Sequence, residues 1–290
     1  MNIPGLFYSV DEFCQQIQTA SGEQLLLGEG QKRRKKCKLS MSKVMTIIIL
    51  FHQSDYRTFK HFYSYLHIAG SRAFPELPSY NRFVELMPRA LLPLVGYLIS
   101  RRGKCSGINY VDSTSIAVCK NKRISRNRVF KDLAALGKSS MGWFFGFKLH
   151  IIINDIGELL AFTLSPANVD DRKELAKMSK GLWGKLYGDK GYISEKLFRQ
   201  LFENGLELIT NIRQNMKNAL LPIQDKILLR KCSLIETVND QLKNISQIEH
   251  SRHRNPINFL INLLGGLIAY SRQTKKPSLN LCKNLPLTSN

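Results

Sequence analysis

The sequence predicts a mixed α/β fold, in which a sheet flanked by helices follows an all-helical N-terminal region. Up to about residue 105, apolar side chains recur at three- and four-residue spacing, which is typical of amphipathic helices. From about residue 108 the chain becomes rich in β-branched and aromatic residues that alternate with polar ones. Beyond residue 170, helix-like and strand-like segments alternate, which indicates a mixed sheet covered by helices.

The N-terminal region is expected to resemble a helix-turn-helix. Serines can cap helix-like segments that begin near residues 40, 54 and 79. The first turn of the third segment carries Tyr80, Asn81 and Arg82. In a helix-turn-helix, residues at the start of the second helix contact bases, so these three are candidate DNA-binding residues. Three packed helices without a DNA role are an equally good interpretation of the pattern, and the charge of the chain favours DNA.

The second part of the chain is expected to contain the sheet. Strands are predicted at residues 108–118, 143–153, 158–164, 182–187 and 206–210. Helices are predicted at residues 171–180, 194–204, 228–248 and 257–270. We therefore expect a helical DNA-binding region at 1–105, a sheet-containing catalytic domain at 106–275 and a tail at 276–290.

The charge of the chain predicts a polyanionic partner. Its 290 residues include 43 Lys and Arg against 22 Asp and Glu, which gives a formal net charge of +21. Such a chain binds nucleic acid with a strong dependence on salt. An ordinary basic protein is the alternative. A basic run early in the chain is typical of a solvated arm that meets an acidic polymer; its candidate DNA-binding residues are Lys32, Arg33, Arg34, Lys35 and Lys36.

Neither a disulfide framework nor a membrane protein is expected. The six cysteines include no Cys-x-x-Cys pair, which fits a reducing compartment. The N-terminus lacks the pattern of a signal peptide. The apolar run at residues 257–270 is too short and too polar to cross a bilayer, so it is predicted to be a buried helix.

Three separated acids are the candidate catalytic and metal-binding residues. Asp112 lies inside an apolar strand-like segment, where a carboxylate is costly to bury unless it is paired or bound to a metal. Asp189 follows a short buried strand and stands between Gly188 and Gly191, which let a phosphate approach closely. Glu236 lies on the polar face of a predicted helix. A turn aspartate and a solvated helix face are the alternative interpretations of the last two.

The predicted sheet can bring these acids together, because Asp112 and Asp189 lie on strands expected to be neighbours. Three such carboxylates could hold two Mg²⁺ ions about 4 Å apart for an in-line displacement at phosphorus. The basic residues expected around them to meet phosphate are Lys148, Lys190 and Lys243.

Five segments carry a resemblance to a known family: residues 110–114, 142–150, 188–192, 235–243 and 249–256. They resemble bacterial insertion-sequence transposases with an RNase H-like catalytic domain, and the insertion-sequence nine-eight-two family in particular. The resemblance implies an Asp-Asp-Glu triad made of Asp112, Asp189 and Glu236. It also implies Mg²⁺ as cofactor, with Mn²⁺ as an alternative, and a DNA partner comprising element ends and target. A homodimer on DNA and a bacterial cytoplasmic, nucleoid-associated location are expected.

One position departs from the family pattern. Relatives carry a basic residue four positions before the catalytic glutamate, where this chain has Cys232. A thiol cannot make the bidentate phosphate contact of an arginine, so Arg230 or Lys231 is expected to substitute, or the enzyme is less active. Arg252 and Arg254 are further candidate phosphate contacts. An RNase H-like nuclease without strand transfer, and an inactive DNA-binding relic of a transposase, are the alternative functions.

Overall fold

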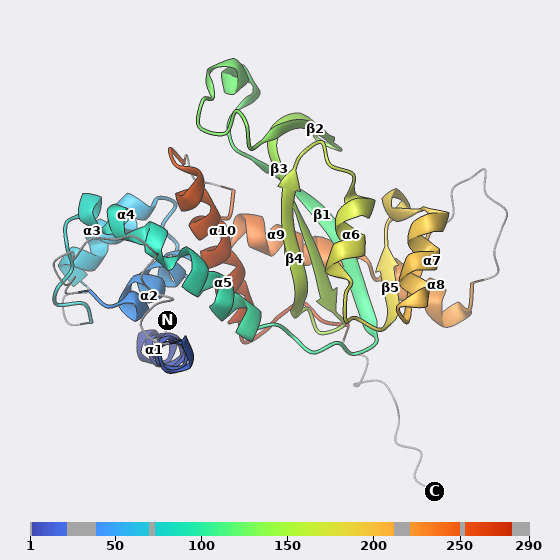
Figure 1. The fold of residues 1–290 in the computed structure, drawn as a ribbon, viewed down its shortest axis with the longest axis horizontal. Helices are drawn as coiled ribbons and strands as arrows, with labels where there is room; N and C mark the ends of the chain where they lie inside the picture. Colours follow the sequence, from blue (N-terminus) through green and yellow to red (C-terminus); the bar gives the residue numbers. More distant parts are fainter. Residues whose placement is uncertain (1, 22–38, 70–72, 212–220, 250–252, 280–290) are drawn as a thin grey trace, which may run out of the picture. The chain divides into compact units, whose positions relative to one another are not determined.

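The computed structural model describes residues 2–21, 39–69, 73–211, 221–249 and 253–279 (Figure 1). The chain forms two compact units. The first contains Met1–Arg101 and Leu242–Arg272, and the second contains Arg102–Gln241 and Gln273–Asn290. The first unit therefore includes the last long helix, which sequence analysis grouped with the sheet. The predicted domain limits stay a prediction.

The first unit is helical throughout its described residues. Helix α10 (Pro256–Ser271) packs against α2 (Met41–His52) and α5 (Leu91–Ser100), and it is almost wholly buried, as predicted. A hydrogen bond of 2.6 Å joins His52 Nδ1 to the carbonyl of Ser246. The other elements of the unit are α1 (Ile3–Ser21), α3 (Phe59–Ala69), α4 (Tyr80–Leu86) and the short 3-10 helix η2 (Met87–Ala90).

The second of the three predicted segments begins later than expected, at Phe59 rather than near residue 54. The reason is local hydrogen bonding. The hydroxyl of Ser54 donates to the carbonyl of Phe51 (2.7 Å), which closes the end of α2. Thr58 Oγ1 instead accepts from the backbone N–H of His61 (3.4 Å) and caps α3. Helix α4 does begin after Ser79, as predicted.

The helical stretch Tyr80–Ser100 passes a length and hydropathy test for crossing a membrane, and among the described residues it alone does so. Its apolar side chains have another explanation, because Phe83, Ala90 and Leu94 are fully buried within the first unit. A core helix of a folded domain meets the same test.

The second unit is built on one mixed sheet. Its strands are β1 (Ile108–Ala117), β2 (Ala135–Ser139), β3 (Gly142–Asn154), β4 (Leu159–Pro166), β5 (Gly184–Gly188) and β6 (Leu206–Thr210). The order is β2-β3-β1-β5-β6, and β4 also pairs with β3. Strand β3 is antiparallel to its neighbours, whereas β5 is parallel to β1 and β6. The predicted fold class, an RNase H-like mixed sheet flanked by helices and preceded by an all-α region, is confirmed.

Helices cover the sheet, and β1 sends alternate side chains to its two faces. On one face, Val111 and Leu186 pack with residues of α6 (Asp171–Met178), η4 (Lys190–Tyr192) and α7 (Glu195–Glu203). On the other face, the Tyr110 hydroxyl donates to the carbonyl of Leu228 on α8 (Ile223–Arg230). The buried carboxylate of Asp225 on α8 accepts from Lys185 and from Tyr187, at 2.7 to 2.8 Å. Helix α9 (Ser233–Asn244) follows α8.

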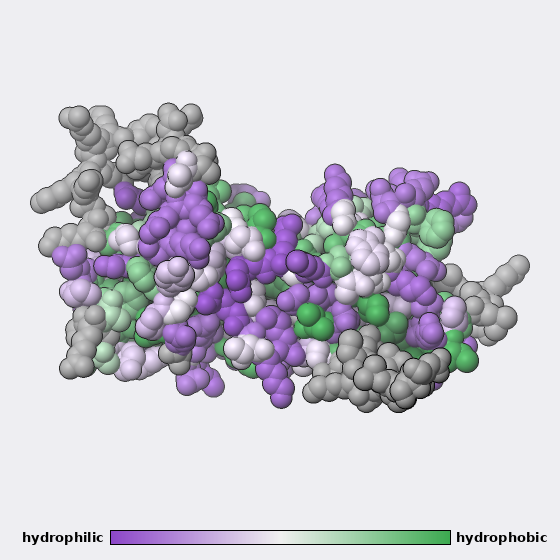
Figure 2. All heavy atoms as spheres, turned by 90° about the horizontal axis from the view of Figure 1, so that it is seen from below, coloured by the Kyte–Doolittle hydropathy of each residue, from purple (hydrophilic) through white to green (hydrophobic). Residues whose placement is uncertain are grey.

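Two elements differ from the sequence predictions. Strand β2 was not predicted. The helix expected at residues 228–248 is two helices, α8 and α9, separated at Lys231 and Cys232. The apolar side chains of Ile245 and Trp143 are 56% and 58% exposed. On the face shown in Figure 2, hydrophilic side chains predominate and apolar ones form small separate groups.

Candidate active site

Asp112 and Asp189 are placed together by strand register. Strands β1 and β5 pair in parallel, with Tyr110 opposite Tyr187. Continuing this register by two residues sets Asp112 opposite Asp189, which directly follows the last residue of β5. Neighbouring strands lie about 4.8 Å apart, so the two carboxylates lie close together on one face of the sheet, where β5 ends beside β1. Asp112 is half-buried and Asp189 is exposed.

The turn after β5 is closely packed around two glycines. A Cβ at Gly188 would lie 3.0 Å from Val111 Cγ1 on β1, and a Cβ at Gly191 would lie 2.9 Å from Asp189 Oδ1. The carboxylate of Asp189 accepts a hydrogen bond of 2.9 Å from the backbone N–H of Gly191 and so caps η4. Small residues therefore hold Asp189 at the strand end with its side chain open to solvent.

Helix α9 contacts Asp112 through Asn239. The Asn239 side-chain amide donates to Asp112 Oδ2 at 2.8 Å, while the backbone N–H of Ser113 donates to Asp112 Oδ1 at 2.8 Å. Glu236 precedes Asn239 by three residues and so lies on the same side of α9. Asn239 Oδ1 is buried and has no hydrogen-bond partner among the described residues. It is the kind of oxygen acceptor that a cation or an ordered water would satisfy.

The three acids influence one another electrostatically. Burial raises the pKa of the Asp112 carboxyl from 3.8 to about 6; repulsion from Asp189 and Glu236 adds to the rise, and its two hydrogen bonds oppose it. The Cys232 thiol lies at the same place. Burial, followed by repulsion from Glu236, Asp112 and Asp189, raises its pKa to about 11. A neutral thiol therefore stands beside the acids.

The residues suit a hard divalent cation, although the described residues include no three acidic, histidine or cysteine side chains already gathered closely enough to hold one. Carboxylate and amide oxygens are the ligands that Mg²⁺ prefers. Asp112, Asp189 and Glu236 would supply negative charge, and the unpartnered oxygen of Asn239 adds a neutral acceptor. A cation among them would also offset the repulsion that raises the pKa of Asp112.

A second polar group lies on the opposite face of the sheet, next in sequence to Asp112. The Ser113 hydroxyl donates to Asp171 Oδ2 (2.8 Å) at the start of α6. The Lys148 ammonium donates to Asp171 Oδ1 (2.7 Å) and to the carbonyl of Val169 (3.1 Å). Asp171 is the first residue of the helix predicted at residues 171–180, and no local pattern in the sequence signals this contact. The ion pair with Asp171 occupies Lys148, and its predicted phosphate contact stays a prediction.

The remaining predicted DNA-binding residues are spread over both units. Arg82 pairs with Glu85 at 2.7 Å on the first turn of α4. Lys190, Arg230, Lys231 and Arg254 are exposed. Among the other three described residues of this set, Asn81 is exposed, Tyr80 is half-buried, and Lys243 pairs with Glu249 at 3.3 Å. Outside the described residues lie Lys32, Arg33, Arg34, Lys35, Lys36 and Arg252.

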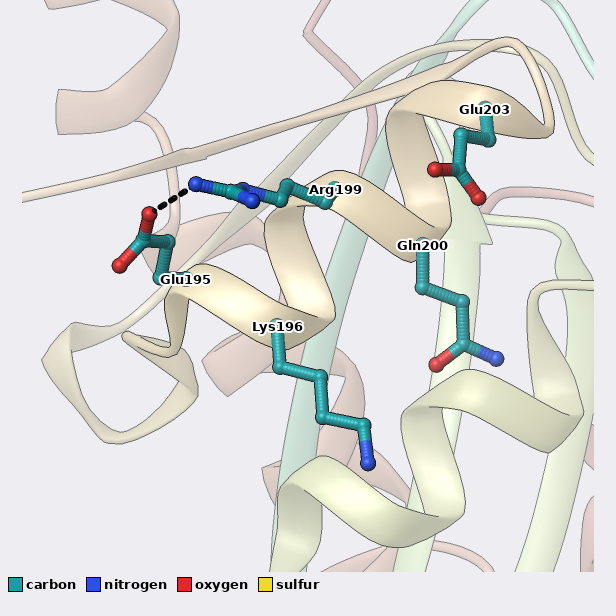
Figure 3. Close-up of a pocket in the computed structure, with 5 residues that line it drawn as sticks. All are labelled: Glu195, Lys196, Arg199, Gln200 and Glu203. Atoms are coloured by element: carbon teal, nitrogen blue, oxygen red, sulfur yellow. Dashed lines mark hydrogen bonds and ion pairs between the residues drawn. The ribbon is translucent and has the colours of Figure 1, made fainter.

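One pocket of the second unit lies away from the acids. It is lined by one surface of α7, with the ion-paired Glu195 and Arg199 beside Lys196, Gln200 and Glu203 (Figure 3). Its lining comes from a single amphipathic helix, whose opposite side buries Leu197 and Leu201. This pocket brings together no residues that sequence analysis singled out.

Comparison with known proteins supplies the family. A family model described as a transposase DDE domain matches residues 102–256. The matched segment contains Asp112, Asp189 and Glu236 and covers slightly more than half of the chain. No curated protein matches the chain significantly. The extent of the family match means that this chain belongs to the transposase DDE domain family.

Proposed function

We propose that this protein is a DNA transposase that binds the ends of an insertion sequence, cleaves them and joins them to target DNA. Family membership supports an enzyme of the nuclease and transposase kind with DNA as its partner. The observation that carries the finer proposal is the hydrogen bond from Asn239 to Asp112. This bond joins helix α9, which bears Glu236, to Asp112 on β1, and Asp112 lies beside Asp189 at the end of the neighbouring strand β5.

Asp112, Asp189 and Glu236 would hold two Mg²⁺ ions, with Mn²⁺ as an alternative. When bound, such ions activate the attacking oxygen and stabilise the leaving oxygen of an in-line displacement. Asp112 must lose its proton to serve as a ligand, and Asn239 and the Ser113 N–H fix the direction of its oxygens. Gly188 and Gly191 keep the approach to Asp189 free of side chains.

The DNA phosphates near the reacting bond are proposed to meet Lys190, Arg230 and Lys231, which flank the acids in sequence and are exposed. Tyr80, Asn81 and Arg82 are proposed to contact the element ends from the first turn of α4. Because transposition handles two ends, a homodimer on DNA is the expected assembly. Because the proposed substrate is DNA, the protein is expected to act at the bacterial nucleoid.

The test uses labelled duplexes taken from the DNA on either side of the gene, incubated with Mg²⁺ and wild-type protein. An Asp189→Asn variant is compared with Glu203→Gln, which changes an exposed acid on α7 outside the site. Cleavage and joining that are lost in Asp189→Asn and kept in Glu203→Gln support the proposal. Cleavage without joining would favour an RNase H-like nuclease, and binding without cleavage would favour the inactive relic.

A further inference from the structure

The segment between the end of β1 and the start of β3, which includes β2, forms a folded, strongly basic projection of the second unit, which we call the basic lobe (residues 118–141). It contains the 3-10 helix η3 (Asn121–Arg126) and extends beyond the end of the sheet (Figure 1). Sequence analysis assigned no function to it. Its exposed basic side chains are Lys120, Lys122, Arg123, Arg126, Arg128, Lys131 and Lys138, against the single acid Asp132.

The lobe is held to the sheet by its own contacts. The buried ring of Phe130 packs edge-on against Phe147 of β3, with ring centres 6.0 Å apart. The Asn121 side chain donates to the carbonyl of Trp143 at 2.8 Å, which joins η3 to the start of β3. The positive charges are therefore presented from a fixed scaffold.

The charges of the lobe lack internal partners. Among the described residues, none of its seven basic side chains forms an ion pair. Clustered like charges repel one another and lower the stability of the folded state unless a counter-charge is supplied. An external polyanion would supply that charge.

The position of the lobe relates it to the acids. The lobe begins after Ala117, the last residue of β1, which lies five residues beyond Asp112 on the same strand. Asp189 follows β5, which runs parallel to β1 and ends beside Asp112. At about 3.3 Å per residue, the lobe begins about 16 Å from Asp112, which is about half a helical turn of DNA. Met141, at the end of the lobe, is 96% exposed, and Trp143, just after it, is 58% exposed. The Lys138 ammonium lies 6.0 Å from the centre of the Trp143 ring. Exposed aromatic side chains beside cations are typical of nucleic-acid surfaces.

We propose that the basic lobe is a DNA-binding surface that grips the phosphates of the duplex about half a turn away from the bond held at the acids. The inference deepens the proposed function, because it assigns the path of the DNA away from that site. An anionic membrane is the other polyanion that a basic surface with exposed Trp and Met could meet. DNA is favoured because the lobe extends from the strand that carries Asp112.

The test compares two triple variants with the same change in charge. The lobe variant combines Lys122→Ala, Arg123→Ala and Arg126→Ala. The control combines Lys180→Ala, Lys196→Ala and Lys226→Ala, which removes three exposed lysines at scattered places on the same unit. Binding of a labelled duplex is measured by fluorescence anisotropy at several salt concentrations. Both proteins also carry Asp189→Asn, so that binding is measured without turnover.

We expect the lobe variant to bind roughly tenfold or more weakly than the control, with a salt-dependence slope lower by roughly two to three. Equal affinities and slopes for the two triple variants would overturn the inference. So would a lobe variant that loses binding to phosphatidylserine vesicles but binds DNA as the control does. Because cleavage is assayed separately, a wild-type protein that fails to cleave would count against the proposed function and leave the lobe result standing.

A second readout uses the two tryptophans of the chain, Trp143 and Trp183. In a Trp183→Phe background the emission reports on Trp143 alone. Duplex binding is expected to change this emission in the charge control and to leave it unchanged in the lobe variant at the same DNA concentration. Emission that is insensitive to saturating DNA in both proteins would exclude Trp143 from the surface.

Discussion

Replacing Asp112 with asparagine is expected to abolish DNA cleavage and also to stabilise the folded protein near neutral pH. Burial and the neighbouring acids raise the pKa of Asp112 from 3.8 to about 6, so the folded protein binds a proton here more tightly than the unfolded chain does. The charged carboxylate therefore lowers the free energy of unfolding by its full amount above about pH 6, and it has no such effect below about pH 4, where Asp112 is protonated in both states. At 1.36 kcal/mol per unit, this cost is about 3 kcal/mol.

The amide of an Asp112→Asn variant fits the site. Its oxygen can still accept from the Ser113 N–H, which lies 2.8 Å from Asp112 Oδ1. Its NH₂ group would face the Asn239 amide, which can rotate by half a turn and present its unpartnered Oδ1 as acceptor. The substitution thus removes a charge without leaving a new unsatisfied group, and most of the 3 kcal/mol should appear as stability.

Thermal unfolding in the presence of a chelator, from about pH 4 to about pH 8, measures this effect. We expect the variant to melt roughly 5–10 °C higher than wild type at the upper end, with the difference vanishing at the lower end. Glu203→Gln, which changes an exposed acid on α7, is the control and should leave the melting temperature nearly unchanged. A melting temperature at about pH 8 equal to that of wild type, or a gain that persists at about pH 4, would refute the reasoning.

Three other substitutions test separate parts of the structure. Asp171→Asn weakens the hydrogen-bond acceptor that Ser113 and Lys148 share, and so loosens the strand beside Asp112. We expect the cleavage rate to fall roughly 10- to 100-fold with DNA affinity unchanged. A normal cleavage rate would exclude a positioning role for Asp171. Cys232→Arg places a cation among the three acids and should raise the rate of in vitro strand cleavage, whereas an unchanged rate would remove the hypothesis that the thiol limits activity. Gly146→Ala would bring a Cβ within 2.1 Å of the carbonyl oxygen of Ile116. We expect it to lower the free energy of unfolding, measured with denaturant, by about 1–3 kcal/mol or more. An unchanged free energy of unfolding would mean that β1 and β3 separate easily.

Much of the fold could be predicted from local pattern. Alternating apolar residues predicted β1 and β4, and the glycine-flanked acid predicted the end of β5. Strand β2 was missed because its five residues, Ala-Leu-Gly-Lys-Ser, include glycine and lysine and carry little β-propensity. It is a strand because its backbone pairs with β3, which no local pattern reveals.

In the sequence, Asp112 was identified by the energetic cost of burying a carboxylate, and Asp189 and Glu236 by the residues around them. The resemblance to transposases joined the three into one set. Asp112 stood out because a carboxylate in an apolar strand needs compensation. Asn239 and Asp171 could not be singled out in this way, since polar residues on a helix and acids at a helix start are common. Their importance depends on two hydrogen bonds, to Asp112 and to Ser113, that span 127 and 58 residues of chain.

The sequence by itself determined the fold class and the basic character and offered the three acids as candidates, because periodicity, composition and unusual local context are properties of neighbouring residues. Only the tertiary structure decided which polar groups meet those acids, where Cys232 lies, and that the charges between β1 and β2 belong to one anchored lobe. The physical reason is register. The pairing of β1 with β3 and β5 brings distant residues within hydrogen-bond range, and that pairing is set by the packing of the whole sheet rather than by any one segment.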